Sequence, residues 1–546
     1  MKDFQIIIGG EAGEGSKKAG MIIANFFNVY GFNVFIHEDY QSLIKGGHNF
    51  SSISVSERKV DGVREEVDFV LALNEDTIFK HKNKIKKEGG VLIYDENCTD
   101  KDFSAEGFKV VKVPLMEIVK KVEGINLMKN TALVSSFAKI IGLKWEVIEE
   151  VLGKELKVEL EKNIEVAKLA FQETETVKEV EAVGEKKGEL ISGNEAVALG
   201  AVDAGLECFF AYPMTPATGI LRFFVNYDKV KTFQPENEIS VANMVLGAGY
   251  TGKRTMTGTS GGGFALMTEA LSLSAQSETP FVVALSQRMG PASGVPTYQG
   301  QGDLLFALNA GHGDMMRFVV APGDADDAYY LTGEALNTAW KYQLPSIIIL
   351  DKEISENTYT FKKEKQVEKR EALLAENNAD YDRYDGEDIS PMAFPGGEAV
   401  VKATSYEHDK KGVVTEDAEA IKKMQEKRIR KYEKLRQEVE EMETVRVTGS
   451  GSVAVVFWGS TKGAVLEAVK DLEIKAIQVL IMEPFSKKQM KEALVGVEKI
   501  ISIETNATGQ LSKVLQCNGF KVDEEILKYN GRPFSVDELE EKLKDL

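Results

Sequence analysis

The residues best suited to chemistry in this chain begin with a threonine held between two prolines. The strand-like run Cys208–Ala211 leads directly into the segment Tyr212–Pro216, which reads Tyr, Pro, Met, Thr, Pro. Proline fits neither a helix interior nor the hydrogen-bonded ladder of a sheet, so this segment must form a rigid turn that holds the Thr215 hydroxyl in place. A stiff loop that only caps the strand would have the same composition, so the turn alone leaves both interpretations open.

A glutamate follows at the start of an apolar helix. Gln234–Glu238 contains four acidic or amide side chains, and the pattern after it predicts a helix over 236–250. Such side chains at a helix N-terminus are ordinary capping groups. A glutamate buried at that end, here Glu238, could instead face a ring nitrogen of a ligand.

Two further loops follow strand-like runs in the same segment. Gly258–Gly263 contains Thr-Ser-Gly-Gly-Gly, and glycines allow a ligand to approach the backbone closely. Arg288 follows the run Phe281–Leu285 in a loop rich in Gly and Pro, and a guanidinium fits a carboxylate bidentately. Ligands of open α/β sheets bind at the carboxyl ends of the strands, so these loops together predict a ligand site.

A second glycine-rich region lies near the N-terminus. Gly9–Gly15 joins a strand-like run to a helical pattern, which is a way to hold a phosphate on backbone N–H groups. It matches neither the Walker A spacing nor the dinucleotide fingerprint, and Glu11 and Glu14 would repel a phosphate. A tight strand-to-helix turn explains it equally well, and the glycine pair in Lys45–Asn49 is by itself a turn.

The elements that position these loops alternate between strand and helix, which predicts an α/β fold of several open parallel-sheet domains. We expect five parts. These are an α/β domain over 1–172, a charged linker over 173–188, a second α/β domain over 189–355, a helix-rich connection over 356–449 with helical patterns in Lys363–Asn377 and Glu416–Glu443, and a third α/β domain over 450–546.

Composition excludes several classes of protein. The 546 residues carry a net charge of −19 without a long basic stripe, so neither nucleic acid nor a membrane surface is an expected partner. Apolar runs are only of strand length, and the N-terminus leads straight into one, so we expect a cytoplasmic protein without a signal peptide. The three scattered cysteines and five histidines show no spacing for a disulfide framework, an iron–sulfur cluster or a zinc site, so no metal ligand is predicted.

The motifs in their order resemble a known family. The motifs of residues 212–297 resemble those of the alpha subunit of 2-oxoacid:ferredoxin oxidoreductases, and the resemblance continues through Ser390–Gly396, Glu407–Asp409, Glu426–Arg428, Trp458–Ser460 and Glu504–Gln510. The first segment resembles the gamma subunit of the same family, through its glycine-rich opening and Ile44–Asn49. The chain is therefore similar to a gamma–alpha fusion over nearly all of its length. Met214, where the family often has Ile, and Gly262, where it often has Pro, are mild departures that remove no functional group.

The resemblance implies an enzyme that uses thiamine diphosphate. The resemblance implies that residues 1–172 form a gamma-type domain and that residues 189–355 bind the pyrimidine half of the cofactor. It also implies that residues 450–546 are similar to the transketolase C-terminal domain. The implied reaction is CoA-dependent oxidative decarboxylation of a 2-oxoacid to an acyl-CoA and CO2, with electrons passed to ferredoxin. The fused layout resembles 2-oxoglutarate enzymes first, and pyruvate and branched-chain 2-oxoacid enzymes after them.

The resemblance also assigns roles to residues. Glu238 takes the place of the glutamate on the pyrimidine ring, where it favours the imino tautomer that accepts the thiazolium proton. Arg288 takes the place of the arginine on the substrate carboxylate, with Thr297 shaping the pocket and Thr215 over the reacting centre. The other residues expected to bind the cofactor are Tyr212, Pro213, Pro216, Gly261 and Gly262. The residues expected to contact coenzyme A are Gly10, Gly13, Gly15, Gly46 and Gly47.

The chain lacks a Gly-Asp-Gly motif with a downstream Asn, which is the magnesium and diphosphate half of such a site. We therefore expect a separate beta subunit that brings Mg2+ and a 4Fe–4S cluster, in an (αβ)2 assembly that reduces ferredoxin. Two other classes stay open: a nucleotide-binding protein that uses the Gly9–Gly15 loop, and a non-catalytic scaffold subunit.

Overall fold

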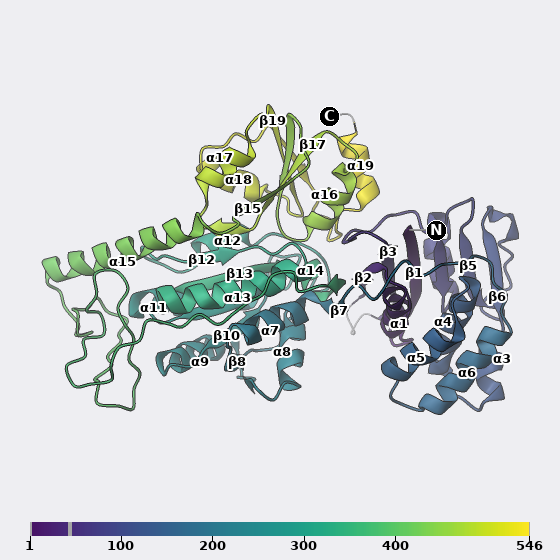
Figure 1. The fold of residues 1–546 in the computed structure, drawn as a ribbon, viewed down its shortest axis with the longest axis horizontal. Coiled ribbons are helices and arrows are strands. Elements are labelled where there is room, and N and C mark those ends of the chain that lie inside the picture. The colour runs from purple at the N-terminus through teal and green to yellow at the C-terminus, as the bar shows by residue number, and fades with distance from the viewer. Residues whose placement is uncertain (1–2, 42–45, 545–546) are drawn as a thin grey trace. The chain divides into compact units, whose positions relative to one another are not determined.

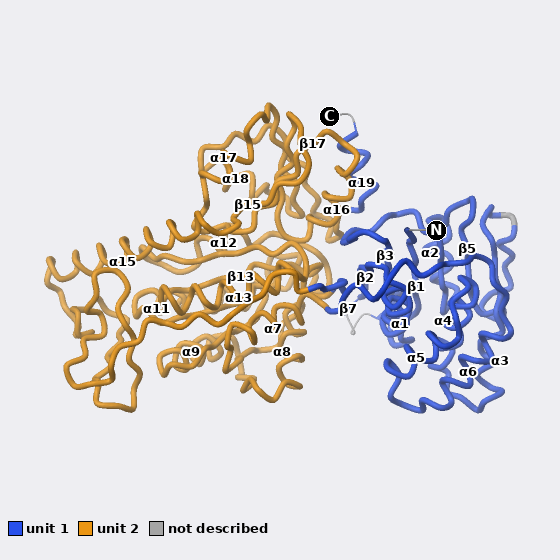
Figure 2. Tube along the Cα trace, in the orientation of Figure 1, with its two compact units in different colours: residues 1–191, 357–362, 535–545 blue, residues 192–356, 363–534, 546 orange. Residues whose placement is uncertain are grey.

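The computed structural model describes residues 3–41 and 46–544, and the chain divides into two compact units (Figure 2). The first unit consists of Met1–Ile191, Asn357–Lys362 and Ser535–Asp545. The second consists mainly of Ser192–Glu356 and Lys363–Phe534. Each unit is α/β, so the predicted fold class is confirmed.

The first unit is built on an eight-stranded sheet in the order β6-β5-β4-β1-β3-β2-β14-β7. Its strands are β1 (Asp3–Glu11), β2 (Asn33–Asp39), β3 (His48–Ser56), β4 (Phe69–Ala72), β5 (Val91–Asp95), β6 (Lys109–Val113), β7 (Glu189–Ser192) and β14 (Thr358–Phe361). The four strands from β6 to β1 are parallel, whereas β3 pairs antiparallel with both β1 and β2. The sheet is therefore mixed, because β3 enters it as an antiparallel strand between β1 and β2.

Helices surround this sheet and close its core. They are α1 (Ser16–Val29), α2 (Glu75–His81), α3 (Leu115–Lys121), α4 (Lys129–Ile140), α5 (Trp145–Glu155), α6 (Leu160–Gln172) and α19 (Val536–Leu543). Apolar residues of α1 recur at helical spacing, and Phe27 packs edge-on against Phe32 with ring centroids 5.9 Å apart. The last helix belongs to this unit because Arg64 forms a bidentate ion pair with Glu540.

The second unit contains a seven-stranded sheet in the order β18-β12-β13-β11-β10-β8-β9 (Figure 1). Its strands are β8 (Cys208–Phe210), β9 (Lys231–Phe233), β10 (Thr255–Thr259), β11 (Phe281–Gln287), β12 (Phe318–Val320), β13 (Pro345–Asp351) and β18 (Ile481–Glu483). All neighbours are parallel except β18, which pairs antiparallel with β12. Its helices are α7 (Gly193–Asp203), α8 (Thr218–Val225), α9 (Glu238–Tyr250), α10 (Gly261–Leu266), α11 (Thr268–Ser277), α12 (Leu304–Asn309), α13 (Ala325–Tyr342) and α14 (Lys352–Glu356).

A second sheet of five strands completes this unit, in the order β15-β17-β16-β19-β20. Its strands are β15 (Val445–Thr448), β16 (Val453–Phe457), β17 (Ile474–Val479), β19 (Lys499–Glu504) and β20 (Glu524–Leu527), and its helices are α16 (Thr461–Val469), α17 (Lys487–Ala493) and α18 (Gln510–Cys517). One hydrophobic core includes Leu285 and Ile349 of the first sheet together with Val456 and Trp458 of the second. The two sheets therefore share a core.

The connection between the two sheets differs from the prediction in one respect. The long helix predicted in Glu416–Glu443 is present as α15 (Ala418–Val439), whereas the helix predicted in Lys363–Asn377 is wrong, because residues 363–377 contain no helix. Charged side chains of this segment form ion pairs with other elements instead: Arg370 pairs with Glu334 of α13 at 2.7 Å. Val367 is buried against Gly333. Tertiary contacts therefore outweigh local helix propensity here.

None of the helices in the described parts of the chain combines the length and the apolar character that a bilayer crossing requires.

Candidate active site

Four neighbouring parallel strands bring the predicted site residues to one edge of the seven-stranded sheet. The order β11-β10-β8-β9 places the carboxyl ends of these strands side by side. Arg288 follows β11, the Ser260–Gly263 turn follows β10, Tyr212–Pro216 follows β8 and Glu238 follows β9. Loops that lie far apart in the sequence thus meet where open α/β sheets bind their ligands.

Arg288 joins two of these loops directly. Its Nη1 donates to the Thr215 carbonyl oxygen at 2.7 Å, which ties the loop after β11 to the proline-bounded turn after β8. Arg288 is half-buried, and burial lowers the pKa of its guanidinium while the charge of Asp303 opposes that shift. Within the described residues, the other donors of this guanidinium form no hydrogen bond, so they are available to an anion.

Glu238 is the first residue of α9 and is only 4% exposed. The helix is capped by Asn237, whose side chain accepts from the Ser240 amide, so Glu238 is not needed as a cap. Within the described part of the chain, its Oε1 atom has no hydrogen-bond partner. A buried acceptor of this kind fits a ligand that supplies the missing donor.

The glycines at the start of α10 leave no room for larger side chains at two positions. A Cβ atom on Gly263 would lie 2.7 Å from the Oε1 of Glu238 and 2.2 Å from the hydroxyl of Thr259. A Cβ atom on Gly261 would lie 2.5 Å from the Oδ2 of Asp303. By contrast, Gly262 faces open space. Gly261 and Gly263 are therefore needed for packing against protein side chains, and the contact of Gly261 and Gly262 with a cofactor stays a prediction.

Asp303 is a further residue of this edge that sequence reasoning missed. It begins α12, and its amide donates to the Gln287 side chain at 2.8 Å, at the end of β11. Burial raises the pKa of Asp303 to about 6, with the charge of Arg288 opposing the shift. A carboxylate with this pKa beside the arginine loop is a group that changes charge near neutral pH.

The other predicted site residues lie in the same loops with fewer defined contacts. Thr297 is buried in the loop between β11 and α12, and Pro216 is buried where its carbonyl accepts from Asn194 at 2.9 Å. Tyr212 and Pro213 are exposed at the end of β8. Their exposed position places them on the surface of the edge, where a ligand or a partner chain could reach them.

The glycine-rich turn of the first unit has a different character. Gly13 and Gly15 have positive φ angles of 97° and 83°, which explains the need for glycine there. Inside the turn, both oxygens of Glu14 are bonded: Oε1 accepts from Lys129 at 2.6 Å, and Oε2 accepts from the Glu11 amide at 2.6 Å and from Asn74 at 3.1 Å. A carboxylate therefore occupies the interior of the turn, where a phosphate cradle would need its donors free.

The second glycine pair contacts this turn through the backbone. The Ala12 amide donates to the Gly47 carbonyl at 2.8 Å, while Ile44 and Lys45 lie outside the described residues. His48 then packs on His81 with their Nε2 atoms 2.8 Å apart. Burial lowers the pKa of His81 to about 3, so the two rings share a single hydrogen bond as neutral imidazoles.

Within residues 3–41 and 46–544, no group of three or more His, Cys, Asp or Glu side chains is arranged to hold a metal ion. The three cysteines are free thiols.

Two family models match the chain. The model described as "Pyruvate flavodoxin/ferredoxin oxidoreductase, thiamine diP-bdg" covers residues 199–427, and the one described as "Pyruvate ferredoxin/flavodoxin oxidoreductase" covers residues 5–173. The first includes Thr215, Glu238 and Arg288. The fold and this edge therefore define an oxidoreductase subunit with a thiamine diphosphate-binding domain.

Two relatives identify the family. The 2-oxoacid:ferredoxin oxidoreductase subunit alpha of Saccharolobus solfataricus is 32% identical, over 98% of this chain and 97% of its own. The 2-oxoglutarate synthase subunit KorA of Archaeoglobus fulgidus is 30% identical, over 60% of this chain and 90% of its own. The chain belongs to the alpha subunits of the 2-oxoacid:ferredoxin oxidoreductases, so the resemblance read from its motifs is confirmed.

A solved structure agrees over the whole chain. The 2-oxoglutarate:ferredoxin oxidoreductase from Magnetococcus marinus with 2-oxoglutarate, coenzyme A and succinyl-CoA bound matches with a TM-score of 0.89 and 30% identity. The match covers 100% of this chain and 99% of that one.

Proposed function

We propose that this chain, paired with a beta subunit, oxidises a 2-oxoacid to an acyl-CoA and CO2, and that 2-oxoglutarate is its preferred substrate. The observation that carries the proposal is the buried Oε1 of Glu238, which has no partner among the described residues yet lies beside the glycine turn. The relatives named 2-oxoglutarate synthase and the 2-oxoglutarate bound in the matching structure support the choice of substrate.

Glu238 would hold the pyrimidine ring of thiamine diphosphate by accepting a hydrogen bond from it. When bound, this cofactor supplies the carbanion that attacks the 2-oxo group. A carboxylate at this place would favour the protonated state of a ring nitrogen bonded to it. Gly263 packs directly against that carboxylate, and Gly262 beside it faces open space.

Arg288 would bind the carboxylate that all 2-oxoacids share. One of its nitrogens is committed to the Thr215 carbonyl, which fixes the direction of the guanidinium, and the rest of its fork remains for the substrate. Thr215 would lie over the reacting centre because the same bond holds its turn against the arginine loop. Thr297, buried in that loop, would shape the pocket and influence which 2-oxoacid is preferred.

The beta subunit would complete the site. Described residues provide an acceptor for the pyrimidine but no carboxylate set for magnesium and no thiolate set for a cluster. We propose that the beta subunit brings Mg2+ and a 4Fe–4S cluster, that ferredoxin receives the electrons, and that two αβ pairs form the enzyme.

Coenzyme A would contact the first unit at its glycine-rich turn, at Gly10, Gly13, Gly15, Gly46 and Gly47. The matching structure has coenzyme A bound, which supports coenzyme A as a co-substrate; the assignment to these glycines rests on the resemblance to the gamma subunit. Since Glu14 fills the interior of the turn, any contact with the coenzyme would lie on its outer surface, where Gly13 and Gly46 have open space around them.

Steady-state rates of the co-expressed complex test the proposal. The expected result is reduction of ferredoxin or a viologen that requires both coenzyme A and a 2-oxoacid, with the highest kcat/KM for 2-oxoglutarate among 2-oxoglutarate, pyruvate and a branched-chain 2-oxoacid. A complex that turns over none of these acids would refute the proposed reaction. A higher kcat/KM for pyruvate would refute only the choice of substrate.

A further inference from the structure

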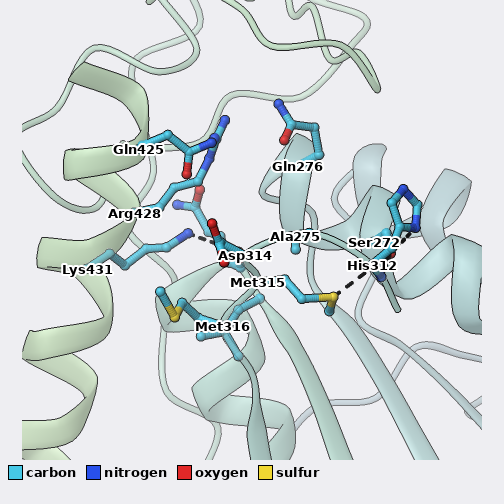
Figure 3. Close-up of a pocket in the computed structure, with 13 residues that line it drawn as sticks. Ser272, Ala275, Gln276, His312, Asp314, Met315, Met316, Gln425, Arg428 and Lys431 are labelled. Atoms are coloured by element: carbon cyan, nitrogen blue, oxygen red, sulfur yellow. Dashed lines mark hydrogen bonds between the residues drawn. The ribbon is translucent and has the colours of Figure 1, made fainter. Parts of the chain in front are cut away.

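A cavity of about 140 Å³ lies in the second unit, away from the sheet edge described above (Figure 3). Residues from α11, from the loop before β12 and from α15 line it. The polar side chains that line it include those of Ser272, Gln276, His312, Asp314, Arg428 and Lys431.

Two of these side chains belong to a buried cluster of charges. Glu278, which is fully buried, accepts from Lys427 on one oxygen and from Lys431 on the other, both at 2.7 Å. Arg428 forms a bidentate ion pair with Glu407, with both bonds at 2.9 Å. Arg383 is also buried, and donates to the Glu278 carbonyl rather than to a carboxylate. The cluster thus holds four cations against two carboxylates.

The neighbouring groups do not supply the missing negative charge. Burial lowers the pKa of His408 and raises that of Tyr384, so both rings are neutral near pH 7. The Tyr384 ring lies 4.8 Å from the Arg383 guanidinium, a cation–π contact that disperses the positive charge without neutralising it. Asp314 is exposed, and with its charge included one positive charge still remains in excess.

Two donors of the cluster are also unsatisfied. Nε of Arg428 and Nη1 of Arg383 are buried and have no hydrogen-bond partner within the described residues. Burial, opposed by Glu278 and reinforced by Lys427, lowers the pKa of Lys431 to about 8. Of the four cations, Arg428 and Lys431 line the cavity, so the unsatisfied Nε of Arg428 and the charge of Lys431 lie at its wall. The cavity has room for a small ligand but not for a nucleotide or for coenzyme A.

We propose that this cavity binds a small oxyanion, a phosphate or a short dicarboxylate, held by Arg428 and Lys431 of α15 on one side and by Ser272 of α11 on the other. Such an anion offsets the excess positive charge of the cluster and links α15 to α11. It therefore stabilises the packing of the long helix on the sheet, and the proposal does not depend on the reaction at the sheet edge.

The test is calorimetric titration of the full chain with inorganic phosphate and, in a second arm, with succinate, at constant ionic strength in chloride. One site per chain is expected, together with a rise in the Tm as the bound anion is added. The tighter of the two ligands identifies the anion as tetrahedral or as a dicarboxylate. Absence of saturable binding of either anion to the folded chain at millimolar concentration overturns the proposal.

A variant that fills the cavity locates the site without changing a charge. Ala275 lines the cavity on α11, and Ala275→Leu should weaken binding by at least about tenfold. Lys423 is exposed on α15, so Lys423→Gln removes one positive charge of the same helix and should leave the affinity unchanged. Equal affinity of wild type and Ala275→Leu would place the anion elsewhere and overturn the proposal, and circular dichroism verifies that both variants fold.

Discussion

Two glutamates at strand-to-helix junctions, Glu238 in the second unit and Glu14 in the first, have opposite surroundings. Glu238 begins α9 and is 4% exposed, and its Oε1 has no hydrogen-bond partner among the described residues. Both oxygens of Glu14 are bonded, by Lys129 on one side and by Asn74 and the Glu11 amide on the other. The same residue type is thus an open acceptor at one junction and a satisfied structural group at the other.

This contrast separates a carboxylate that is suited to bind a ligand from one that only stabilises the fold. A buried carboxylate oxygen that has lost water without gaining a partner reduces the stability of the fold. A chain retains such a group where a ligand provides the missing donor, whereas a satisfied carboxylate needs no ligand. The comparison supports the proposed role of Glu238 as a ligand-binding group, whereas the bonds of Glu14 stabilise its own turn.

The largest effect is expected from Glu238→Gln in the complex with the beta subunit. Turnover should fall by about two to four orders of magnitude, because the amide has no charge with which to tune a bound ring. Thermal unfolding of the isolated chain should be unchanged or should move to a higher temperature, since a buried charge is removed. Acceptor reduction and a melting curve measure the two effects.

Glu236→Gln is the matched control for that variant. Glu236 is exposed two residues earlier and bonds the Ser240 hydroxyl, so its loss should leave turnover near the wild-type rate. Near-normal turnover of Glu238→Gln, or an equal loss in both variants, would contradict the role given to Glu238.

Arg288→Ala should raise KM and lower kcat/KM by about one to two orders of magnitude, because a charged hydrogen bond of this kind is worth about 1.5–3 kcal/mol. The loss should be similar for 2-oxoglutarate, pyruvate and branched-chain acids, since they share the carboxylate. Arg288→Lys keeps the positive charge but cannot bond a carboxylate bidentately, so its kcat/KM should lie between those of wild type and Arg288→Ala. A loss confined to 2-oxoglutarate would mean that Arg288 binds the distal carboxylate instead.

Asp303→Asn should change how the stability of the isolated chain depends on pH. The folded chain holds a proton on Asp303 up to about pH 6, above the range in which an unfolded aspartate ionises, so the ionised form destabilises the fold as pH rises beyond 4. The variant should therefore be more stable at pH 7.5, by roughly 3 kcal/mol, and nearly equal to wild type at pH 4. Urea unfolding at the two pH values measures this, and a gain of the same size at both would refute the assignment.

The smallest effect is expected at Glu14. Glu14→Gln breaks a partly buried ion pair with Lys129 and should lower the free energy of unfolding by about 1 kcal/mol. Glu150→Gln removes an exposed i,i+4 pair with Lys154 and should cost at most about 0.5 kcal/mol. Denaturant unfolding of both variants compares them. A Glu14 variant as stable as wild type would show that the bonded carboxylate does not hold the turn.

Local signals explain what could be predicted from the sequence. Prolines at a strand end are visible in a short window, so the turn at Tyr212–Pro216 was predicted. Of the predicted turn Gly258–Gly263, Gly258 and Thr259 end β10 and Gly261–Gly263 begin α10, so the junction is shorter than predicted. The neighbouring strands bring both junctions to one edge. The helix pattern of α15 was equally clear. The roles of Thr215, Glu238 and Arg288 came from resemblance and stay predictions until variants are measured.

Contacts between distant residues explain what was missed. Asp303 joins the edge only because α12 folds back on β11, and Glu14 is bonded by Lys129, which lies 115 positions away. Strand β3 was not predicted, although its second half alternates serine with Ile53 and Val55. Four of its buried residues are serines, and two of these bond polar partners: Ser51 donates to Glu38 and Ser54 donates to Gln5. The polar face of this strand is therefore buried by contacts with distant residues, which the local pattern does not show.

The central claim is that this chain holds only the pyrimidine half of a cofactor site. The most direct test is 2-oxoacid-dependent reduction of a viologen, with thiamine diphosphate, Mg2+ and coenzyme A present, by the purified chain alone and by the chain co-expressed with its beta subunit. The chain alone should be colourless and inactive, and the complex should be brown and active only with coenzyme A. Turnover of a 2-oxoacid by the isolated 546-residue chain would contradict the account.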